Sequence, residues 1–477
     1  MKGLTPGNIA KTIGAEIYVI KNGQPRAASA SGLPEKEASA VVIDSRLCER
    51  DCIFVATKGE RVDGADFIGN AFEKGALAVV TERTPAERAA DGIWFVVKDS
   101  FQALKKLATF YREQMSNVKI VGIVGSVGKT STKELTAAAL SAGYSVLATQ
   151  GNLNNEIGVP LTLLRIRDEH EMAVVEMGIS NFGEMSRLGA MVRPDAVLFT
   201  NIAPCHLEAL GNLWGVLRAK TEIFDYVKEG GSIVLNGRDP ILATIANIRG
   251  ANLYFYGSEH SNMKAGKIKE CGMDGSEFDA VFDDGTERES FNVSLKLPGE
   301  HMILNALGAA LVAKLFGVGC SEAARAMSSV KPSDTGRTVR ETINGIEIIN
   351  DAYNASPLSV RAAIDILSEA KGRKVAILGD MLELGSDECR LHFETGEYAA
   401  KKGIDLLICA GKLSENTVKG FGKESLWFET TDALTDALPL PLKKGDTVLL
   451  KASHGMHFEK IFAAAKEGKL FGDQANG

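Results

Sequence analysis

The chain has 477 residues, of which 45% are hydrophobic and 24% are charged, a balance that is ordinary for a globular protein. Its 54 basic and 61 acidic residues give a formal net charge of −7 without a lysine or arginine block, which argues against a nucleic-acid surface. Seven scattered cysteines argue against a disulfide framework, and no run approaches the ~18 apolar residues of a membrane span, so we expect a cytoplasmic protein.

The pattern of the chain predicts three α/β domains, as its length also suggests at about 150 residues per domain. Residues 1–115 alternate strand-like and helix-like runs and end in a helical stretch. Residues 116–325 alternate strands and helices in the way that is typical of a mostly parallel sheet, with a polar insertion that predicts hairpins. Residues 326–477 supply the strands of a third α/β unit.

A glycine-rich loop in the central segment carries the clearest chemistry. Residues 121–134 read VGIVGSVGKTSTKE, in which no glycine has the usual P-loop spacing before Gly128. The physical requirements are still met, because Gly125 and Gly128 let the main chain approach a phosphate and Lys129 supplies charge. Thr130 adds a hydroxyl for magnesium. An ordinary glycine turn is the alternative, but a strand, this loop and a helix in succession favour a nucleotide site.

Three more polar residues follow predicted strands of the central segment. Glu176 ends the apolar run MAVVE and is a candidate magnesium ligand, although a glutamate at a strand end is often simply solvated. His206 lies in TNIAPCHLEALG and Lys220 in LRAKTEIF, where a structural histidine and a surface lysine are the simpler interpretations. The residues alone leave His206 and Lys220 undecided.

Polar stretches in the first and third segments are equally open. VIDSRLCERD contains Ser45 and Arg46, which form either a polar loop or a site where arginine holds an anionic ligand. GRTVRE and NDAYNASPLS contain Arg337, Asp351 and Asn354 near strand ends, and the Ser-Pro pair predicts the start of a helix. Turn chemistry alone could explain most of this pattern.

Taken together, these stretches resemble the Mur ligases, the ATP-dependent amide-forming enzymes of peptidoglycan synthesis. In chain order the matching stretches are IDSR, VGSVGKTSTKE, GNLNNEIGVPLTLL, VVEMG, TNIAPCHLE, AKTEIF, GEHMILNALGAA, NDAYNASPLS, LGDMLELG and KASHGMHFE. The resemblance implies a first domain that binds a UDP precursor and a central ATP-binding domain with the family's shortened GxxGKT loop. It also implies a C-terminal Rossmann-like ligase domain.

The resemblance also implies a role for individual residues. Lys129 would bind ATP phosphates, and Thr130 and Glu176 would hold one magnesium ion. His206 and a carbamylated Lys220 would hold a second magnesium ion, and with Lys129 they are the implied catalytic residues. The other implied nucleotide contacts are Gly125, Ser126, Gly128, Ser131, Asn305, Arg337, Asp351 and Asn354. The implied substrate contacts are Ser45 and Arg46 at the uridine end, Asn154, Asn155 and Glu156 at the muramoyl peptide, and Ser453.

Within the family, the third segment indicates the amine donor. NDAYNASP is present, whereas the DNPR-like motif of the ligase that adds the third amino acid is absent. This implies that D-alanyl-D-alanine is joined to UDP-N-acetylmuramoyl-tripeptide through an acyl phosphate, and we expect a monomer. The alternatives are addition of the third amino acid to the muramoyl-dipeptide, a P-loop NTPase switch, and a binding protein without catalysis.

Three positions depart from the family pattern. Ala65 replaces a common histidine, Met302 replaces a frequent asparagine, and His454 replaces an arginine with a titratable group. The phosphate and metal residues are intact. The sequence therefore leaves the substrate contacts at these three positions open.

Overall fold

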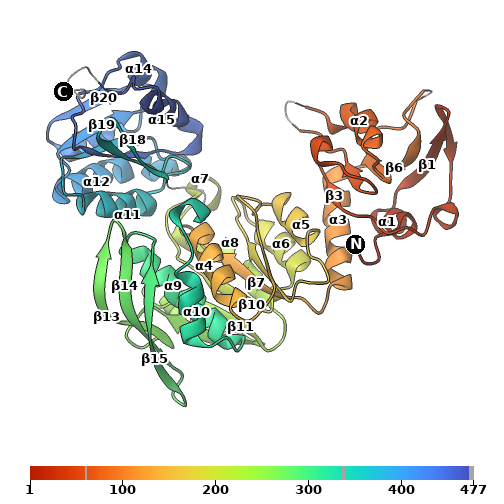
Figure 1. Ribbon diagram of the computed structural model, residues 1–477, viewed down its shortest axis with the longest axis horizontal. Helices are drawn as coiled ribbons and strands as arrows, with labels where there is room; N and C mark the ends of the chain where they lie inside the picture. Colours follow the sequence, from red (N-terminus) through yellow and green to blue (C-terminus); the bar gives the residue numbers. More distant parts are fainter. Residues whose placement is uncertain (60–61, 87, 336–338, 472–477) are drawn as a thin grey trace.

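Within the residues that the computed structural model describes, the chain forms three β-sheets, each with its own flanking helices (Figure 1). The described residues are 1–59, 62–86, 88–335 and 339–471. The three sheets lie between residues 16 and 96, 119 and 295, and 339 and 451, so the predicted α/β class with three sheet-bearing domains is confirmed. The domain boundaries near residues 115 and 325 stay predictions.

The N-terminal sheet has the order β2-β1-β6-β5-β4-β3 among the described strands. Its strands are β1 (Glu16–Lys21), β2 (Gln24–Ala27), β3 (Val41–Val42), β4 (Ile53–Val55), β5 (Ala78–Thr81) and β6 (Gly92–Val96), and its helices are α1 (Pro6–Ile13), α2 (Ile68–Glu73) and α3 (Ser100–Gln114). Strands β3 to β6 are parallel, and β4 and β5 are buried along their whole length. Asp99 caps the start of α3, which packs against α5 and α6 of the central region.

The central sheet has the order β15-β14-β13-β12-β11-β10-β7-β9-β8 in the part of the chain that is described. Its strands are β7 (Lys119–Val124), β8 (Val146–Ala148), β9 (Met172–Glu176), β10 (Ala196–Phe199), β11 (Gly231–Asn236), β12 (Ala251–Tyr256), β13 (Met263–Gly272), β14 (Gly275–Asp283) and β15 (Arg288–Leu295). Its helices are α4 (Lys129–Ser141), α5 (Gly158–Leu163), α6 (Glu184–Val192), α7 (Leu207–Leu210), α8 (Leu213–Thr221), α9 (Glu300–Leu315) and α10 (Cys320–Met327).

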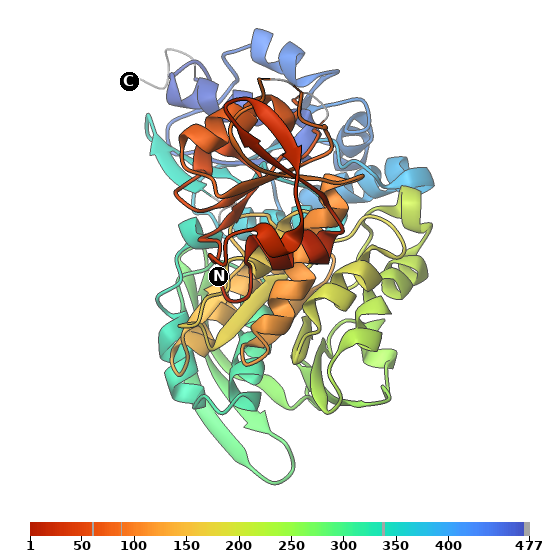
Figure 2. The same ribbon diagram turned by 90° about the vertical axis from the view of Figure 1, so that its right-hand side faces the viewer.

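Strands β7 to β12 are parallel, and the apolar side chains of β7, β9, β10 and β11 are buried on both faces, which explains the continuous apolar runs of these four strands. The polar insertion forms the antiparallel strands β13 to β15, as predicted. Figures 1 and 2 show the turn between β14 and β15 pointing away from the C-terminal region. The carboxyl ends of β7, β9 and β10 share one edge of the sheet, where the polar stretches meet.

The C-terminal sheet has the order β16-β17-β21-β18-β19-β20 in the described chain, and its strands are parallel apart from β16. Its strands are β16 (Val339–Ile343), β17 (Ile346–Asn350), β18 (Lys374–Gly379), β19 (Leu406–Ala410), β20 (Ser425–Phe428) and β21 (Thr447–Lys451), and its helices are α11 (Pro357–Ser368), α12 (Glu388–Lys401), α13 (Glu415–Phe421), α14 (Thr431–Asp436) and α15 (Glu459–Lys466). Ser356 and Ser359 form a capping box at the start of α11, so the predicted helix start is confirmed.

The C-terminal region touches the carboxyl edge of the central sheet. The N–H of Leu207, at the start of α7, donates to the carbonyl of Glu383 in the loop after β18 at 2.9 Å. None of the helices in the described chain is both long enough and apolar enough to cross a membrane.

Candidate active site

The glycine-rich loop after β7 has the backbone geometry of a phosphate loop. Gly125 has a φ of +149°, and a Cβ atom there would lie 1.9 Å from the hydroxyl of Thr200, so a side chain does not fit. Gly128 has a φ of +84° and caps the start of α4. Asn201, just after β10, accepts the N–H of Val127 at 3.0 Å and holds the loop in place. The loop therefore presents the N-terminus of α4 to the cavity, as a phosphate site requires.

Two side chains of this loop are placed to meet a nucleotide and a metal ion. The Nζ atom of Lys129 lies 2.9 Å from the carbonyl of Gly125 and 3.3 Å from that of Ser126, so its charge is held over the loop. The hydroxyl of Thr130 is buried and makes no hydrogen bond with any residue that the structure describes. A buried hydroxyl without a partner is costly, so this oxygen fits the ligand of a bound cation.

Glu176 ends β9 at the same edge of the sheet and is fully buried. Asn154 donates from Nδ2 to Oε1 of Glu176 at 2.7 Å. The backbone N–H of Glu176 donates to the hydroxyl of Thr149 at 3.0 Å. A buried carboxylate is stable only when hydrogen bonds or a cation compensate its charge. Glu176 therefore has the position and surroundings of a magnesium ligand.

His206 lies where the central and C-terminal regions meet. Its Nδ1 atom is 2.5 Å from Oε2 of Glu383, and its φ of 51° is left-handed. Burial lowers the pKa of His206, and the charge of Glu383 partly opposes this effect. Burial therefore favours the neutral imidazole, which is the form that binds a metal.

Lys220 on α8 is unusual because its side chain is 1% exposed and its amine has no hydrogen bond or ion pair with any described residue. Burial lowers the pKa of Lys220, which increases the fraction of neutral amine. It lies close enough to His206 for the charge of its ammonium form to lower the pKa of that residue. A neutral buried amine is the form that reacts with CO2, so the site fits the implied carbamate.

A cavity of about 730 Å³ brings many of these residues together between the central and C-terminal regions. The predicted site residues that line it are Ser126, Gly128, Lys129, Thr130, Ser131, Asn154, Asn155, Glu156, His206, Asp351 and Asn354. Within the described chain, no three His, Cys, Asp or Glu side chains converge as metal ligands. A metal ion here would therefore need hydroxyl, carbamate, phosphate or water oxygens as well.

On the C-terminal wall of the cavity, the structure reveals a buried lysine that the sequence analysis missed. Lys451 at the end of β21 donates to Oδ2 of Asp351 at 2.5 Å and to the carbonyl of Asn354 at 3.0 Å. It is the lysine of KASH, and β21 is the parallel neighbour of β17, which precedes Asp351. The available signal was that Lys451 and Asp351 each stand at the carboxyl end of a predicted strand. His301 also lines the cavity; it lies in the matching stretch GEHMILNALGAA, but no role was predicted for it.

Five predicted residues near the cavity are not part of its lining: Gly125, Glu176, Lys220, Asn305 and Ser453. Asn305 on α9 is buried, and its amide lies beside Gly128, where a Cβ atom would be 3.4 Å from Nδ2. Ser453 is buried and accepts the N–H of Leu382 at 3.0 Å, so it holds the loop after β18. Arg337 lies outside the described residues.

The predicted uridine contacts are not brought to this cavity. Ser45 is buried in the N-terminal region, whereas the side chain of Arg46 is 86% exposed. Arg46 pairs with Asp44, two residues earlier, at 2.7 Å. Neither residue of this loop lines the cavity between the central and C-terminal regions.

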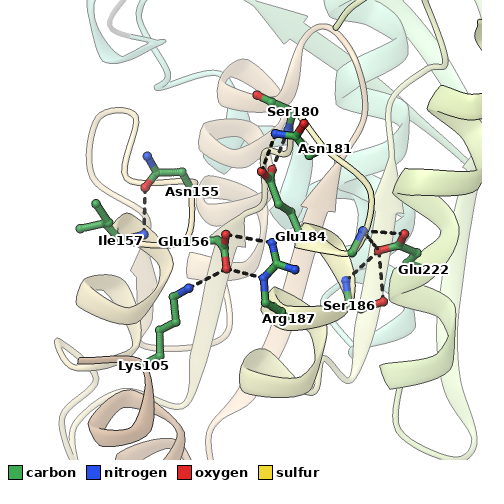
Figure 3. A network of polar contacts seen from close by, with 11 residues as sticks. Lys105, Asn155, Glu156, Ile157, Ser180, Asn181, Glu184, Ser186, Arg187 and Glu222 are labelled. Atoms are coloured by element: carbon green, nitrogen blue, oxygen red, sulfur yellow. Dashed lines mark hydrogen bonds and ion pairs between the residues drawn. The ribbon is translucent and has the colours of Figure 1, made fainter. Parts of the chain in front are cut away.

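The loop that was expected to face the muramoyl peptide uses its polar side chains on the protein itself (Figure 3). The carboxylate of Glu156 pairs with Arg187 at 2.7 Å and with Lys105 of α3 at 2.6 Å. Hydrogen bonds from Arg187, and then from Lys105, lower the pKa of Glu156 to about 2. Asn155 accepts the N–H of Ile157 at 3.1 Å and caps the approach to α5.

The three departures lie in different surroundings. Met302 lines the cavity, with its sulfur 3.6 Å from Nδ2 of Asn305. His454 is exposed and lies 5.7 Å, ring to ring, from Tyr353. The N–H of Ala65 donates to Asp63 in the N-terminal region. Met302 is thus the departure that contacts a predicted nucleotide residue.

Comparison with known families gives a consistent assignment along the chain. Residues 37–112 match the Mur ligase family catalytic domain, residues 123–313 the Mur ligase middle domain, and residues 336–454 the Mur ligase glutamate ligase domain.

Two curated relatives carry the name UDP-N-acetylmuramoyl-tripeptide--D-alanyl-D-alanine ligase. The protein from Bacillus subtilis (strain 168) is 36% identical over 439 residues, which cover 90% of this chain and 93% of the relative. The protein from Escherichia coli (strain K12) is 35% identical over 435 residues, which cover 90% and 94% of the two chains.

Solved structures agree with these relatives. A crystal structure of MurF from Acinetobacter baumannii has a TM-score of 0.84 at 28% identity and covers 97% of this chain and 99% of that one. The MurF ligase from Thermotoga maritima in complex with ADP has a TM-score of 0.75 at 28% identity, with coverage of 90% and 97%.

Proposed function

Because the chain belongs to the Mur ligase family, we propose that it joins D-alanyl-D-alanine to UDP-N-acetylmuramoyl-tripeptide with ATP, in peptidoglycan synthesis. Relatives of that name match the chain along about nine-tenths of its length. The structural observation that carries the proposal is the cavity in which the phosphate loop faces Asp351 and Lys451 of the C-terminal region. An amide ligase needs such a site, because the activated acid and the amine must meet away from water.

ATP would bind with its phosphates at the loop of Gly125 to Thr130. The N-terminus of α4 and the charge of Lys129 would stabilise the phosphate oxygens. Thr130 and Glu176 would hold one magnesium ion, which offsets negative charge during phosphoryl transfer. Support comes from the unpartnered hydroxyl of Thr130 and from the ADP named with the Thermotoga relative.

His206 and a carbamylated Lys220 would hold a second magnesium ion. The carbamate would replace a cation by a two-oxygen anion, which hard metals prefer. The buried amine of Lys220 and the neutral imidazole of His206 support this assignment. The carboxylate of Glu383 would orient the imidazole through Nδ1 and leave the other ring nitrogen for the metal.

In the proposed reaction, the terminal carboxylate of the tripeptide takes up the γ-phosphoryl group of ATP and ADP is released. The amine of the dipeptide then attacks the acyl carbon, loses a proton and expels inorganic phosphate as the amide bond forms. Lys129 would stabilise the charge that develops on the transferred phosphoryl group. The loop after β18 and residues 351–354 would close the cavity from the C-terminal side and exclude water. Ser45 and Arg46 would bind the uridine end of the substrate, far from the chemistry.

We also propose that the protein acts as a monomer in the cytoplasm, where ATP and a UDP-linked precursor occur together. Light scattering of the purified chain would test the oligomeric state.

The function is tested by ADP release with UDP-muramoyl-tripeptide and either D-alanyl-D-alanine or D-alanine. We expect the dipeptide to be strongly preferred, because D-alanine would leave buried polar partners of the second residue unpaired. Lysine and diaminopimelate are offered in parallel with the muramoyl-dipeptide. Preference for that pair would move the assignment to addition of the third amino acid, and release of ADP without regard to the amine would favour an NTPase switch.

A further inference from the structure

The buried carboxylate of Glu176 is oriented by a loop that carries the implied substrate contacts. Asn154 donates from Nδ2 to Oε1 of Glu176 at 2.7 Å. The carbonyl of Asn154 accepts the N–H of Gly178, two residues beyond Glu176, at 2.8 Å. Asn154 is thus bonded to both sides of the turn that follows β9.

The side chain of Asn154 has little freedom to turn towards a substrate. A Cβ atom on Gly178 would lie 3.1 Å from Cγ of Asn154, so the absence of a side chain at Gly178 makes room for this amide. The backbone N–H of Asn154 is also engaged, with the carbonyl of Asn152 at 2.7 Å. The amide group is therefore fixed in the orientation that serves the carboxylate.

The same loop is tied to the helix that begins at the phosphate site. Lys133 on α4 is 1% exposed, and its Nζ atom donates to the carbonyl of Thr149 at 2.7 Å. The hydroxyl of Thr149 accepts the N–H of Glu176 at 3.0 Å. Movement of the loop would therefore change the distance between Glu176 and Thr130, which lies one turn before Lys133 on the same helix.

From these contacts we infer that Asn154 is a positioning residue for Glu176 and not a contact of the muramoyl peptide. A neutral amide suits this role, because it donates to a buried carboxylate without adding a positive charge that would compete with the metal ion for that carboxylate. The inference rests on the proposed magnesium site but not on the identity of the amine donor. Asn154, the most buried asparagine of this loop, would thus support the binding of magnesium and not the binding of the peptide.

The test is Asn154→Leu, which keeps the approximate size of the side chain and removes the donor. Mn²⁺ binding is measured by electron paramagnetic resonance of the free ion in the presence of ADP, so no turnover is needed. We expect the Kd of Mn²⁺ to rise about tenfold or more, as is usual when a hydrogen bond to a metal ligand is lost. In the ligase assay kcat should fall, whereas KM for the muramoyl peptide should not change.

Asn292→Leu on β15 is the matched control, because it removes an asparagine amide that donates to the carboxylates of Glu277 and Asp279 away from the cavity. It should leave the Kd of Mn²⁺ unchanged. If Asn154→Leu does not fold, Asn154→Ala replaces it with the same expectation.

Two results would overturn the inference. One is an unchanged Kd of Mn²⁺ in the Asn154 variant, with or without a higher KM for the muramoyl peptide. The other is a failure of the unaltered chain to bind Mn²⁺ with ADP, which would remove the metal site itself. A donor other than D-alanyl-D-alanine would contradict the proposed function and leave the Mn²⁺ result standing.

Discussion

The phosphate loop and the loop of Ser45 and Arg46 are both polar loops near strand ends, but the structure prepares them to different degrees. Around the phosphate loop, the hydroxyl of Thr130 and the carboxylate of Glu176 are buried and the backbone excludes a side chain at Gly125. In the N-terminal loop, Arg46 is exposed and pairs with the adjacent Asp44. The comparison teaches that one loop is organised for its ligand in advance, whereas the other keeps an exposed arginine paired with its own neighbour.

The strongest test of this difference is Lys129→Ala. We expect kcat/KM to fall by roughly a hundredfold or more, about 3 kcal/mol, because a charge contact to the transferred phosphoryl group is lost. Tm should not change, since the side chain stabilises phosphate and not the core. Lys106→Ala on the exposed face of α3 is the control, and near-normal turnover of the Lys129 variant would remove the phosphate loop from the mechanism.

Lys220→Ala tests whether the residues of the proposed second magnesium site are also organised in advance. We expect activity to fall roughly a hundredfold, because loss of a metal ligand removes several kcal/mol of charge stabilisation. Formate or acetate should restore part of it by taking the place of the carbamate. The independent measurement is a ¹³C signal of the carbamate after incubation with ¹³CO2, present in the unaltered chain and absent in the variant. No signal in the unaltered chain would contradict the modification.

Glu156 is intermediate in burial between Thr130 at the phosphate loop and Arg46 in the exposed loop. The carboxylate of Glu156 is half-buried and joins α3 of the N-terminal region to the central region. Its pKa in the folded state, about 2, is below the ordinary value of 4.5. The ion pairs of Glu156 with Lys105 and Arg187 therefore stabilise the fold fully above pH 4.5, and this contribution is lost as the pH falls towards 2. Glu156→Gln should lower the free energy of unfolding at pH 7 by about 1 to 2 kcal/mol, less than the full shift implies, because Arg187 is half exposed.

The measurement for Glu156 is urea unfolding of both chains from pH 7 downwards, and the two curves should converge below pH 4.5. Glu113→Gln on the exposed side of α3 serves as the control. A difference that persists undiminished at pH 3 would show that the stabilisation does not come from the ionised carboxylate.

Arg46→Ala should have the smallest effect. The side chain of Arg46 is largely exposed and already paired with Asp44, so it contributes little when it binds a ligand. We expect KM for the UDP substrate to rise about threefold, with kcat and Tm unchanged. Arg50→Ala, a similarly exposed arginine nearby, is the control in steady-state kinetics. A rise of more than about thirtyfold would mean that this loop is as well organised as the phosphate loop, and the comparison would fail.

The phosphate site was predictable because its information is local. A β-branched run, the loop glycines Gly125 and Gly128, a lysine and a helix-forming stretch lie within residues 119–141, and each acts on its own backbone. The start of α11 was predictable for the same reason, since Ser356 and Pro357 satisfy the first turn of their own helix. The three α/β units follow from hydrophobic periods that are also local.

Contacts between distant segments were not predictable in this way. Lys451 and Asp351 are 100 residues apart and meet because β17 and β21 are parallel neighbours. His206 and Glu383 are 177 residues apart and meet where two regions touch. In the sequence, each of these residues looks like an ordinary polar residue at the end of a strand or in a loop.

The amino-acid sequence by itself determined the α/β class, the shortened phosphate loop and, through the family resemblance, the order of the domains. Tertiary structure alone decided which polar groups are partners: Asn154 with Glu176, and Glu156 with Lys105 and Arg187. The physical reason is that backbone conformation depends mainly on neighbouring residues, whereas burial and the choice of a hydrogen-bond partner depend on how separate elements pack.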